Sequence, residues 1–179
     1  MAAMTSDPAA RLRAEPAGTT FEIVLVEPEI PPNTGNIGRL CAATDSVLHL
    51  VEPLGFRIDE QAVRRAGLDY WPLVKLFTHP SYEAAERALR AAQPERRFWL
   101  FSGKAERSYL DVPYARGDVL VFGKESVGLP DALLEADPER VVAIPTLGAV
   151  RSLNLANAVA VAVYEGLRRL GALDRVALR

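Results

Sequence analysis

The 179-residue sequence predicts an α/β fold, with a mostly parallel sheet and helices on both of its faces. Short apolar runs recur along the chain, and segments with helical periodicity separate them. The runs are apolar throughout, which is typical of strands that are buried on both faces. The sequence contains no internal repeat. Residues 1–20 are expected to form a flexible N-terminal tail, and residues 21–179 a single domain.

The first predicted strand is the β-branched run at residues 21–26. Prolines within residues 28–32 predict an irregular segment after it, because proline lacks the N–H group that regular structure needs. Asn33 or Thr34 is then expected to cap the first helix, whose apolar positions fall on one face.

The remaining elements are predicted from apolar runs, amphipathic spacing and proline stops. Strands are expected at residues 47–51, 74–77, 98–101, 119–122 and 141–144. Helices are expected at residues 60–66, 81–92, 130–135 and 153–170. The last helix carries one apolar stripe, formed by Leu155, Val159, Val163, Leu167 and Leu170.

Composition indicates an ordinary globular protein, since 49% of the residues are hydrophobic and 25% are charged. The single cysteine, Cys41, cannot form an internal disulfide, and no apolar stretch reaches the roughly 18 residues of a membrane span. The N-terminus also lacks the apolar core of a secretory signal, so we expect a cytoplasmic protein. A net charge of −2 does not indicate a nucleic-acid binder, but it leaves room for a local basic face.

Several familiar motifs are absent. Residues 123–126 resemble a phosphate-binding loop, but Glu125 stands where a hydroxyl would have to hold magnesium. His49 and His79 are too isolated in the sequence to nominate a base, and His49 is interpreted as a core or edge residue. Cys41 is interpreted as packing. No cluster of histidine, cysteine and carboxylate residues has metal-ligand spacing, so no metal is expected.

Polar residues gather in three loops that follow predicted strands, EPEIPPNTGN, GKESVGLP and PTLGAVRSLN. In open parallel sheets ligands bind at this edge. Arg39 is expected at the start of the first helix, where a cation opposes the helix dipole, and this placement suggests a bound phosphate nearby. Plain structural alternatives remain for the other polar residues, because Asn33 and Ser152 would also serve as helix caps and Glu125 as a charge at a helix start.

Together the segments NTGNIGRLC, FGKESVGLP and IPTLGAVRSLNLANAVAVAVYEGLRRLG resemble the motifs of the SpoU branch of the SPOUT methyltransferases. The resemblance covers residues 21–178 and includes the segment RRAGLDY. Within the branch the chain is most similar to the small enzymes that 2′-O-methylate the wobble nucleotide of tRNA, a cytidine or a modified uridine. The resemblance implies a C-terminal trefoil knot, S-adenosyl-L-methionine as methyl donor, tRNA as partner, a homodimer through the C-terminal helix, and neither membrane nor metal.

Site residues are carried over from these motifs position by position. The resemblance implies catalytic roles for Arg39, Glu125, Ser152 and Asn154. It implies cofactor contacts from Phe101, Ser102, Gly123, Ile144, Ser152 and Leu153. It implies substrate contacts from Asn33, Arg39 and Arg151. The arginine matching Arg39 has been proposed as the base in related enzymes, but a guanidinium stays protonated. We therefore favour an arrangement in which Arg39 grips a phosphate beside the target ribose, and that phosphate helps accept the proton.

The sequence departs from the family pattern at three positions. Val127 stands where relatives carry a base, Lys124 precedes Glu125, and Gly38 replaces a branched aliphatic residue, which is expected to loosen the first helix. Two alternatives stay open: a SPOUT enzyme for another tRNA position or for rRNA, and a non-catalytic RNA-binding or dimer module.

Two substitutions follow from this interpretation. Gly123→Val is expected to abolish cofactor binding while the fold stays intact, because glycine lets the backbone approach a ligand. Glutamate at Val159 or Val163 is expected to give monomers or insoluble protein, because the last helix is placed in the dimer interface.

Overall fold

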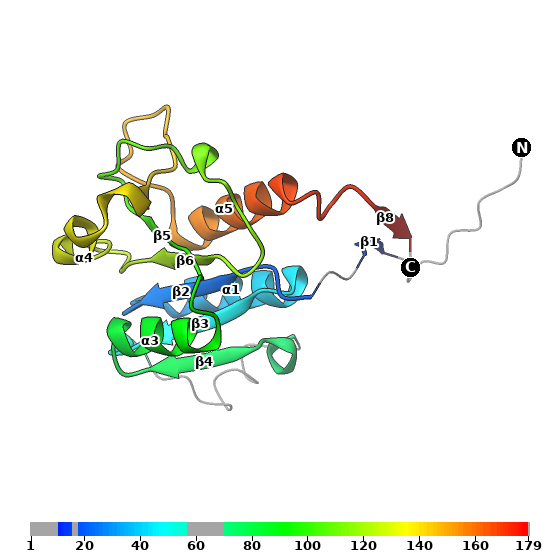
Figure 1. The fold of residues 1–179 in the computed structure, drawn as a ribbon, viewed down its shortest axis with the longest axis horizontal. Helices are drawn as coiled ribbons and strands as arrows, with labels where there is room; N and C mark the ends of the chain where they lie inside the picture. The colour runs from blue at the N-terminus through cyan, green and yellow to red at the C-terminus, as the bar shows by residue number, and fades with distance from the viewer. Residues whose placement is uncertain (1–10, 16–17, 57–69, 179) are drawn as a thin grey trace, which may run out of the picture.

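The computed structural model describes residues 11–15, 18–56 and 70–178, and its core is a six-stranded sheet (Figure 1). The strand order is β4-β3-β2-β6-β5-β7, and every pairing is parallel. The strands are β2 (Glu22–Val26), β3 (Val47–Val51), β4 (Leu76–His79), β5 (Phe98–Phe101), β6 (Val119–Phe122) and β7 (Val141–Val142). The predicted fold class is therefore confirmed.

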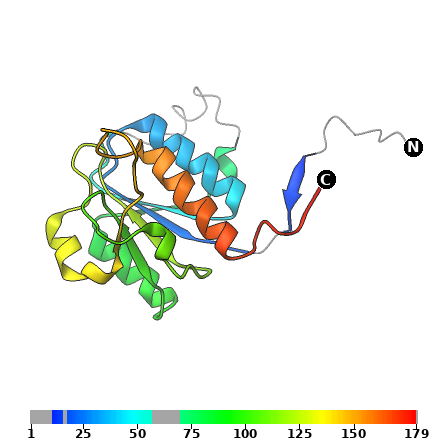
Figure 2. The same cartoon turned by 90° about the horizontal axis from the view of Figure 1, so that it is seen from above.

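Helices cover both faces of the sheet (Figure 2). On one face α1 (Pro31–Thr44) packs beside α5 (Leu155–Arg169), and on the other lie α3 (Tyr82–Ala92) and α4 (Asp131–Ala136). Alternate residues of β2 enter different cores, because Ile23 contributes to the cluster under α1 and α5 whereas Val24 contributes to the cluster under α3 and α4. Burial on both sides explains why the central strands are mostly apolar.

The largest difference from prediction is the start of α1. The helix begins at Pro31, so Pro31 and Pro32 form its first turn instead of an irregular segment, and Ile30 rather than Asn33 or Thr34 is the N-cap residue. The first N–H groups of a helix have no intrahelical partner, so proline is tolerated there.

The other boundaries differ by smaller amounts. Strand β4 is shifted by two residues, β7 ends two residues early, and α4 begins one residue late. Ser81 caps α3, whereas α5 begins two residues late with Asn154, not Ser152, as its cap. The helix predicted at residues 60–66 lies outside the described residues. None of the described helices is long and apolar enough to cross a membrane.

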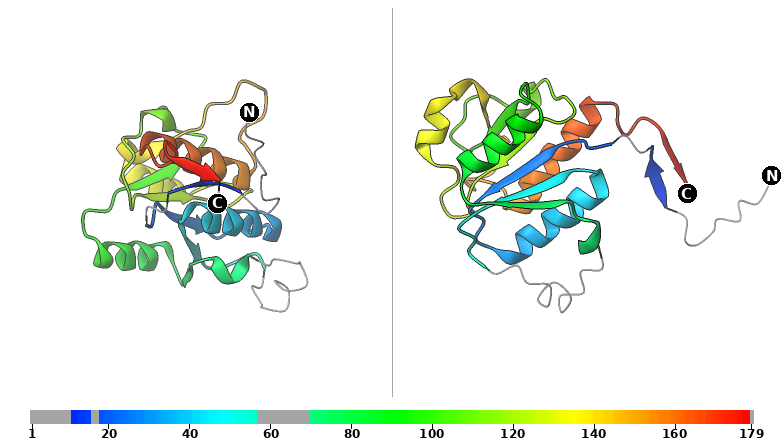
Figure 3. Two further views of the ribbon diagram at one scale, coloured as in Figure 1. Left: turned by 90° about the vertical axis from the view of Figure 1, so that its right-hand side faces the viewer. Right: turned by 60° about the horizontal axis from the view of Figure 1, so that its bottom comes forward.

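A separate two-stranded ribbon stands off from the domain (Figure 3). It pairs β1 (Leu12–Ala14) with β8 (Val176–Leu178) in antiparallel fashion. Three residues of the segment that was treated as a tail are thus in a strand, and its partner near the C-terminus was not predicted.

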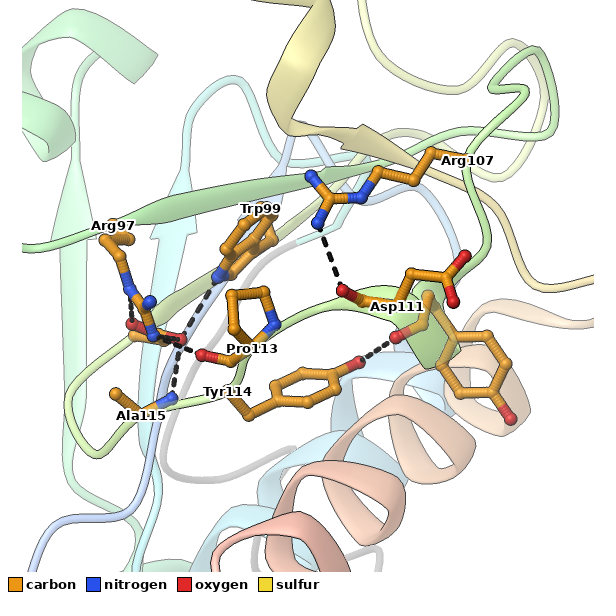
Figure 4. A network of polar contacts seen from close by, with 9 residues as sticks. Arg97, Trp99, Arg107, Asp111, Pro113, Tyr114 and Ala115 are labelled. Carbon is orange, nitrogen blue, oxygen red and sulfur yellow. Dashed lines mark hydrogen bonds and ion pairs between the residues drawn. The ribbon is translucent and has the colours of Figure 1, made fainter.

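The long connection between β5 and β6 is held by hydrogen bonds to the buried Asp118, whose partners Arg97, Trp99 and Ala115 are labelled in Figure 4. Its carboxylate accepts hydrogen bonds from Arg97 Nε and Nη2 at 2.9 and 2.7 Å, from Trp99 Nε1 at 3.1 Å and from the Ala115 backbone N–H at 2.9 Å. Arg97 also donates to the carbonyl oxygen of Pro113 at 2.7 Å. These contacts hold the connection against the sheet.

A chain of polar side chains crosses β2, β3 and β4 on the face covered by α3. Glu22 contacts Arg96 Nη1 at 2.6 Å and His49 Nε2 at 2.8 Å, and His49 Nδ1 lies 2.9 Å from His79 Nε2. His49 is 5% exposed, which agrees with its interpretation as a core residue, although it is bonded to His79 rather than isolated. Cys41 is fully buried, as expected of packing, and burial raises the pKa of its thiol to about 12.

Candidate active site

A cavity of about 590 Å³ opens at the carboxyl ends of the central strands. Three walls come from the segment after β5, the segment after β6 and the segment that joins β7 to α5, and the start of α1 closes the cavity. Its lining comprises Ile30, Asn33, residues 101–104, residues 122–128, Ile144, residues 151–155 and Ala158. This is the sheet edge at which the sequence predicted a ligand.

Glu125 is a fixed hydrogen-bond acceptor at the entrance to α1. Its Oε2 accepts from the Glu29 backbone N–H at 2.8 Å, and its Oε1 accepts from Asn33 Nδ2 at 2.8 Å and from the Ile30 N–H at 3.2 Å. A carboxylate beside a helix N-terminus is stabilised by the helix dipole. Glu125 is therefore both a negative charge at the start of α1 and a residue of the predicted site.

Asn33 connects Glu125 to Asn154 across the cavity. Asn154 Nδ2 donates to Asn33 Oδ1 at 3.0 Å, and Asn154 Oδ1 accepts from the backbone N–H groups of Ala156 at 3.0 Å and Asn157 at 3.4 Å. Because the helix amides need an acceptor, the Asn154 amide can present only its NH₂ group to Asn33. The cap of α5 thus fixes the orientation of both asparagines.

A second pair of contacts joins the same segments. Ser126 donates from its backbone N–H and its hydroxyl to the two carboxylate oxygens of Glu29, at 3.0 and 2.9 Å. These hydrogen bonds hold the pKa of Glu29 below its ordinary value. Sequence reasoning missed Glu29 and Ser126, whose only signal was their position beside predicted residues.

Gly123 is required by the loop itself. A Cβ atom there would lie 2.1 Å from the carbonyl carbon of Gly128 and 2.2 Å from the nitrogen of Leu129. Neither approach is possible without moving backbone. The expectation that Gly123→Val leaves the fold intact is therefore wrong, because the side chain would first break the wall of the cavity.

The cations at the cavity differ in their partners. Lys104 pairs with Asp131 and Lys124 pairs with Glu27, each at 2.5 Å, and the hydrogen bond to Glu27 raises the pKa of Lys124. Within the described part of the chain, Arg151 makes no ion pair or side-chain hydrogen bond. An anion entering the cavity would meet Arg151 with its full charge, whereas Lys124 is already paired with a carboxylate.

Arg39 lies outside the cavity lining. It is the ninth residue of α1, so the argument that it opposes the dipole at the helix start is wrong. Its guanidinium carbon lies 4.4 Å from the ring centroid of Tyr70. Sequence reasoning gave Tyr70 no role, and its only signal was membership of the RRAGLDY segment.

The structure therefore brings together all the predicted site residues except Arg39. Those that line the cavity are Asn33, Phe101, Ser102, Gly123, Glu125, Ile144, Arg151, Ser152, Leu153 and Asn154. They come from segments far apart in the sequence, joined at one edge by the parallel sheet. Among the described residues, no group of three or more histidine, cysteine, aspartate and glutamate side chains is arranged to hold a metal ion.

The chain is similar to curated proteins over most of its length. The tRNA (cytidine(34)-2′-O)-methyltransferase of Escherichia coli K12 is 49% identical over 152 residues, which are 84% of this chain and 94% of that protein. The protein of the same name from Aeromonas hydrophila is 51% identical over 84% of this chain and 95% of its own length.

Solved structures share the fold. One, described as structural insights into the 2-OH methylation of C/U34 on tRNA, is 45% identical, with a TM-score of 0.78 over 84% of this chain and 96% of that one. The SpoU methyltransferase AviRb from Streptomyces viridochromogenes, solved with AdoMet, is 24% identical, with a TM-score of 0.71 over 84% of this chain and 60% of that one. The SpoU rRNA Methylase family model matches residues 20–164. The chain therefore belongs to the SpoU rRNA Methylase family.

Proposed function

We propose that the chain transfers a methyl group from S-adenosyl-L-methionine to the 2′-hydroxyl of the wobble nucleotide of tRNA. The observation that carries this proposal is the cavity at the strand ends, where the Glu125–Asn33–Asn154 network is complete. The relatives that match nearly their whole length are named for cytidine 34, which favours this nucleotide over other RNA sites. This role would place the protein in the cytoplasm.

The cavity fits the cofactor in size and in chemistry. Its volume of about 590 Å³ lies within the range of about 300–1,000 Å³ that is typical of small-molecule sites. The rings of Phe101 and Phe122 stack at 4.5 Å on its sheet side and offer an apolar floor, while the loops offer backbone polar groups. Residues that would hold the cofactor are Phe101, Ser102, Gly123, Ile144, Ser152 and Leu153. When bound, S-adenosyl-L-methionine supplies an electrophilic methyl group on a sulfonium.

Catalysis in this proposal depends on positioning and proton removal, because a ribose hydroxyl is a weak nucleophile. The bound cofactor would supply the methyl group to the 2′-oxygen and leave as the neutral thioether, and the hydroxyl proton would pass to a phosphate oxygen of the substrate. Asn154, held by Asn33 and Glu125, orients the hydroxyl. Ser152 lines the same wall of the cavity. Arg151 and Arg39 grip substrate phosphate.

The proposal is tested by single-turnover methyl transfer to total tRNA that lacks the wobble modification. Wild-type protein is expected to methylate the wobble ribose, and Arg39→Ala is expected to retain cofactor affinity but to transfer methyl about two to three decades more slowly, since a lost electrostatic donor costs about 2–4 kcal/mol. Arg39→Lys should rescue little, because an ammonium cannot grip two phosphate oxygens in parallel. Methylation mapped to another nucleotide would contradict the proposal, and wild-type rates in Arg39→Ala would remove Arg39 from the mechanism.

We also propose a homodimer through the exposed face of α5. Val161 and Tyr164 are 36% and 50% exposed and lie three residues apart on that helix. Val159 and Val163 are fully buried in the core, so glutamate at either position favours insoluble protein over a folded monomer, and neither position tests an interface.

Val161→Glu combined with Tyr164→Glu is expected to give a folded monomer. Both side chains are partly exposed in the single chain, so the charges would disrupt only the contact with a second subunit. Light scattering at micromolar concentration measures the mass. Leu73→Glu, at a position 71% exposed on another surface, is the control and should leave the mass unchanged. A wild-type monomer, or a variant that stays dimeric, would contradict this assignment.

A further inference from the structure

Tyr70 and Trp71 form an aromatic clamp on α1. Trp71 packs so closely against Gly38 that a Cβ atom on that glycine would lie 2.8 Å from the indole ring. Tyr70 Oη donates to the Gly35 carbonyl oxygen at 2.8 Å, and its ring meets Trp71 edge-on with the centroids 6.5 Å apart. Gly38, which departs from the family pattern, therefore makes room for Trp71 and does not merely loosen the helix.

The clamp determines where the Arg39 guanidinium lies. Side chains on a helix lean toward its N-terminus, so Arg39 reaches back along α1 toward the cavity. At 1.5 Å per residue, the Cα atom of Arg39 is about 9 Å beyond that of Asn33, whereas Gly35 is only about 3 Å beyond it. The Tyr70 side chain reaches from the Gly35 carbonyl to the Arg39 guanidinium. It thus holds the guanidinium beside the turn of α1 that runs from Gly35 to Arg39.

Stacking also fixes the direction of the donors. The Arg39 guanidinium carbon lies over the Tyr70 ring, 4.4 Å from its centroid, and a guanidinium that stacks face-on there keeps its N–H edge free for an anion. Parallel N–H donors at this edge match the spacing of two phosphate oxygens. A stacked arginine also loses less conformational freedom on binding than an arginine that is free to rotate.

We infer that Tyr70 is a positioning residue for Arg39, holding its guanidinium near the cavity for a two-point contact with a phosphate of the RNA substrate. This inference rests on the proposed function. The support for the ring comes from Trp71 on Gly38 and from the hydrogen bond to Gly35. The ring itself does not touch the reacting atoms in this scheme, so Tyr70 acts through Arg39.

The test is single-turnover methyl transfer at saturating S-adenosyl-L-methionine and tRNA. Tyr70→Leu removes the ring and is expected to lower the rate about tenfold, whereas Tyr70→Phe keeps the ring and stays within about threefold of wild type. The double variant with Arg39→Ala and Tyr70→Leu is expected to match Arg39→Ala alone, because the ring has no function without the guanidinium. Cofactor affinity, measured by calorimetry, should equal that of wild type in all four variants.

If Tyr70 only stabilised the fold, the single-turnover rate of the double variant would be different. In that case Tyr70→Leu would lower the rate of Arg39→Ala by a further tenfold, and this additivity would overturn the inference. Wild-type activity in Tyr70→Leu would overturn it as well. Wild-type protein that transfers no methyl to the wobble ribose would instead overturn the proposed function, which separates the two failures.

Discussion

Gly123→Ala is expected to abolish S-adenosyl-L-methionine binding, although it adds a single methyl group. The new Cβ atom would lie 2.1 and 2.2 Å from backbone atoms of Gly128 and Leu129, so the loop that forms one wall of the cavity must open. Overpacking of this kind costs about 3 kcal/mol when backbone has to move. The loss should appear both in calorimetric titration with the cofactor and as a lower midpoint of thermal unfolding.

Gly148→Ala is the matched control. No heavy atom lies within 4 Å of a Cβ atom at that glycine, which is in the loop before α5. It should bind the cofactor with wild-type affinity. If Gly123→Ala bound the cofactor as tightly as wild type, the assignment of residues 122–128 to the cofactor-binding wall would be wrong.

Glu22→Gln is expected to cause the largest loss of stability. Glu22 is 5% exposed and contacts both Arg96 and His49, so the neutral amide would leave a guanidinium near the core without its counter-charge. Removing one partner of a buried pair costs about 3–5 kcal/mol. Urea unfolding at neutral pH measures this loss. Glu86→Gln is the control, because its pair with Arg90 is half-exposed and is expected to contribute less than about 1 kcal/mol.

The pH dependence has a defined sign. Burial raises the pKa of Glu22, but the hydrogen bond with His49 and the charge of Arg96 outweigh it and bring the pKa below its ordinary value. The stability that Glu22 contributes is therefore complete above the unfolded pKa and is lost as the pH falls through the folded pKa. Burial and the charge of His49 lower the pKa of His79, so its protonation destabilises the fold from about pH 6.5 downward. Glu22→Gln should flatten the acid part of the stability curve, and an unchanged acid limb would contradict this account.

Strands buried on both faces could be predicted to the residue. Residues 98–101 and 119–122 are continuous apolar runs, and residues 47–51 are apolar except for His49, so burial determines where these strands lie. Strand β4 was misplaced because it lies at the sheet edge, where Phe77 is 55% exposed and the apolar pattern no longer marks the pairing. The start of α1 was misplaced because proline was taken as a helix breaker and not as a first-turn residue.

The site could be predicted as a set of loops but not as a network. The rule for parallel sheets brings the three polar loops to one edge, and the structure agrees. The individual contacts depend on long-range packing. Serine and asparagine are both good N-cap residues, so the sequence does not decide between Ser152 and Asn154. In the structure Asn154 caps α5 and also donates a hydrogen bond to Asn33. The contact of Tyr70 with Arg39 is unpredictable for the same reason, since the two residues are far apart in the sequence.

The bonds that complete the site join residues that are far apart in the sequence. Asn33 meets Glu125 across 92 residues of sequence and Asn154 across 121. During synthesis, β2, α1 and β3 can form on the ribosome, but the amide that orients Asn33 is added only near the end of translation. Closing such long loops is also a slow step, because its entropy cost must be met before the contacts form. A nascent chain of this protein therefore cannot bind its cofactor productively before the rest of the domain has folded.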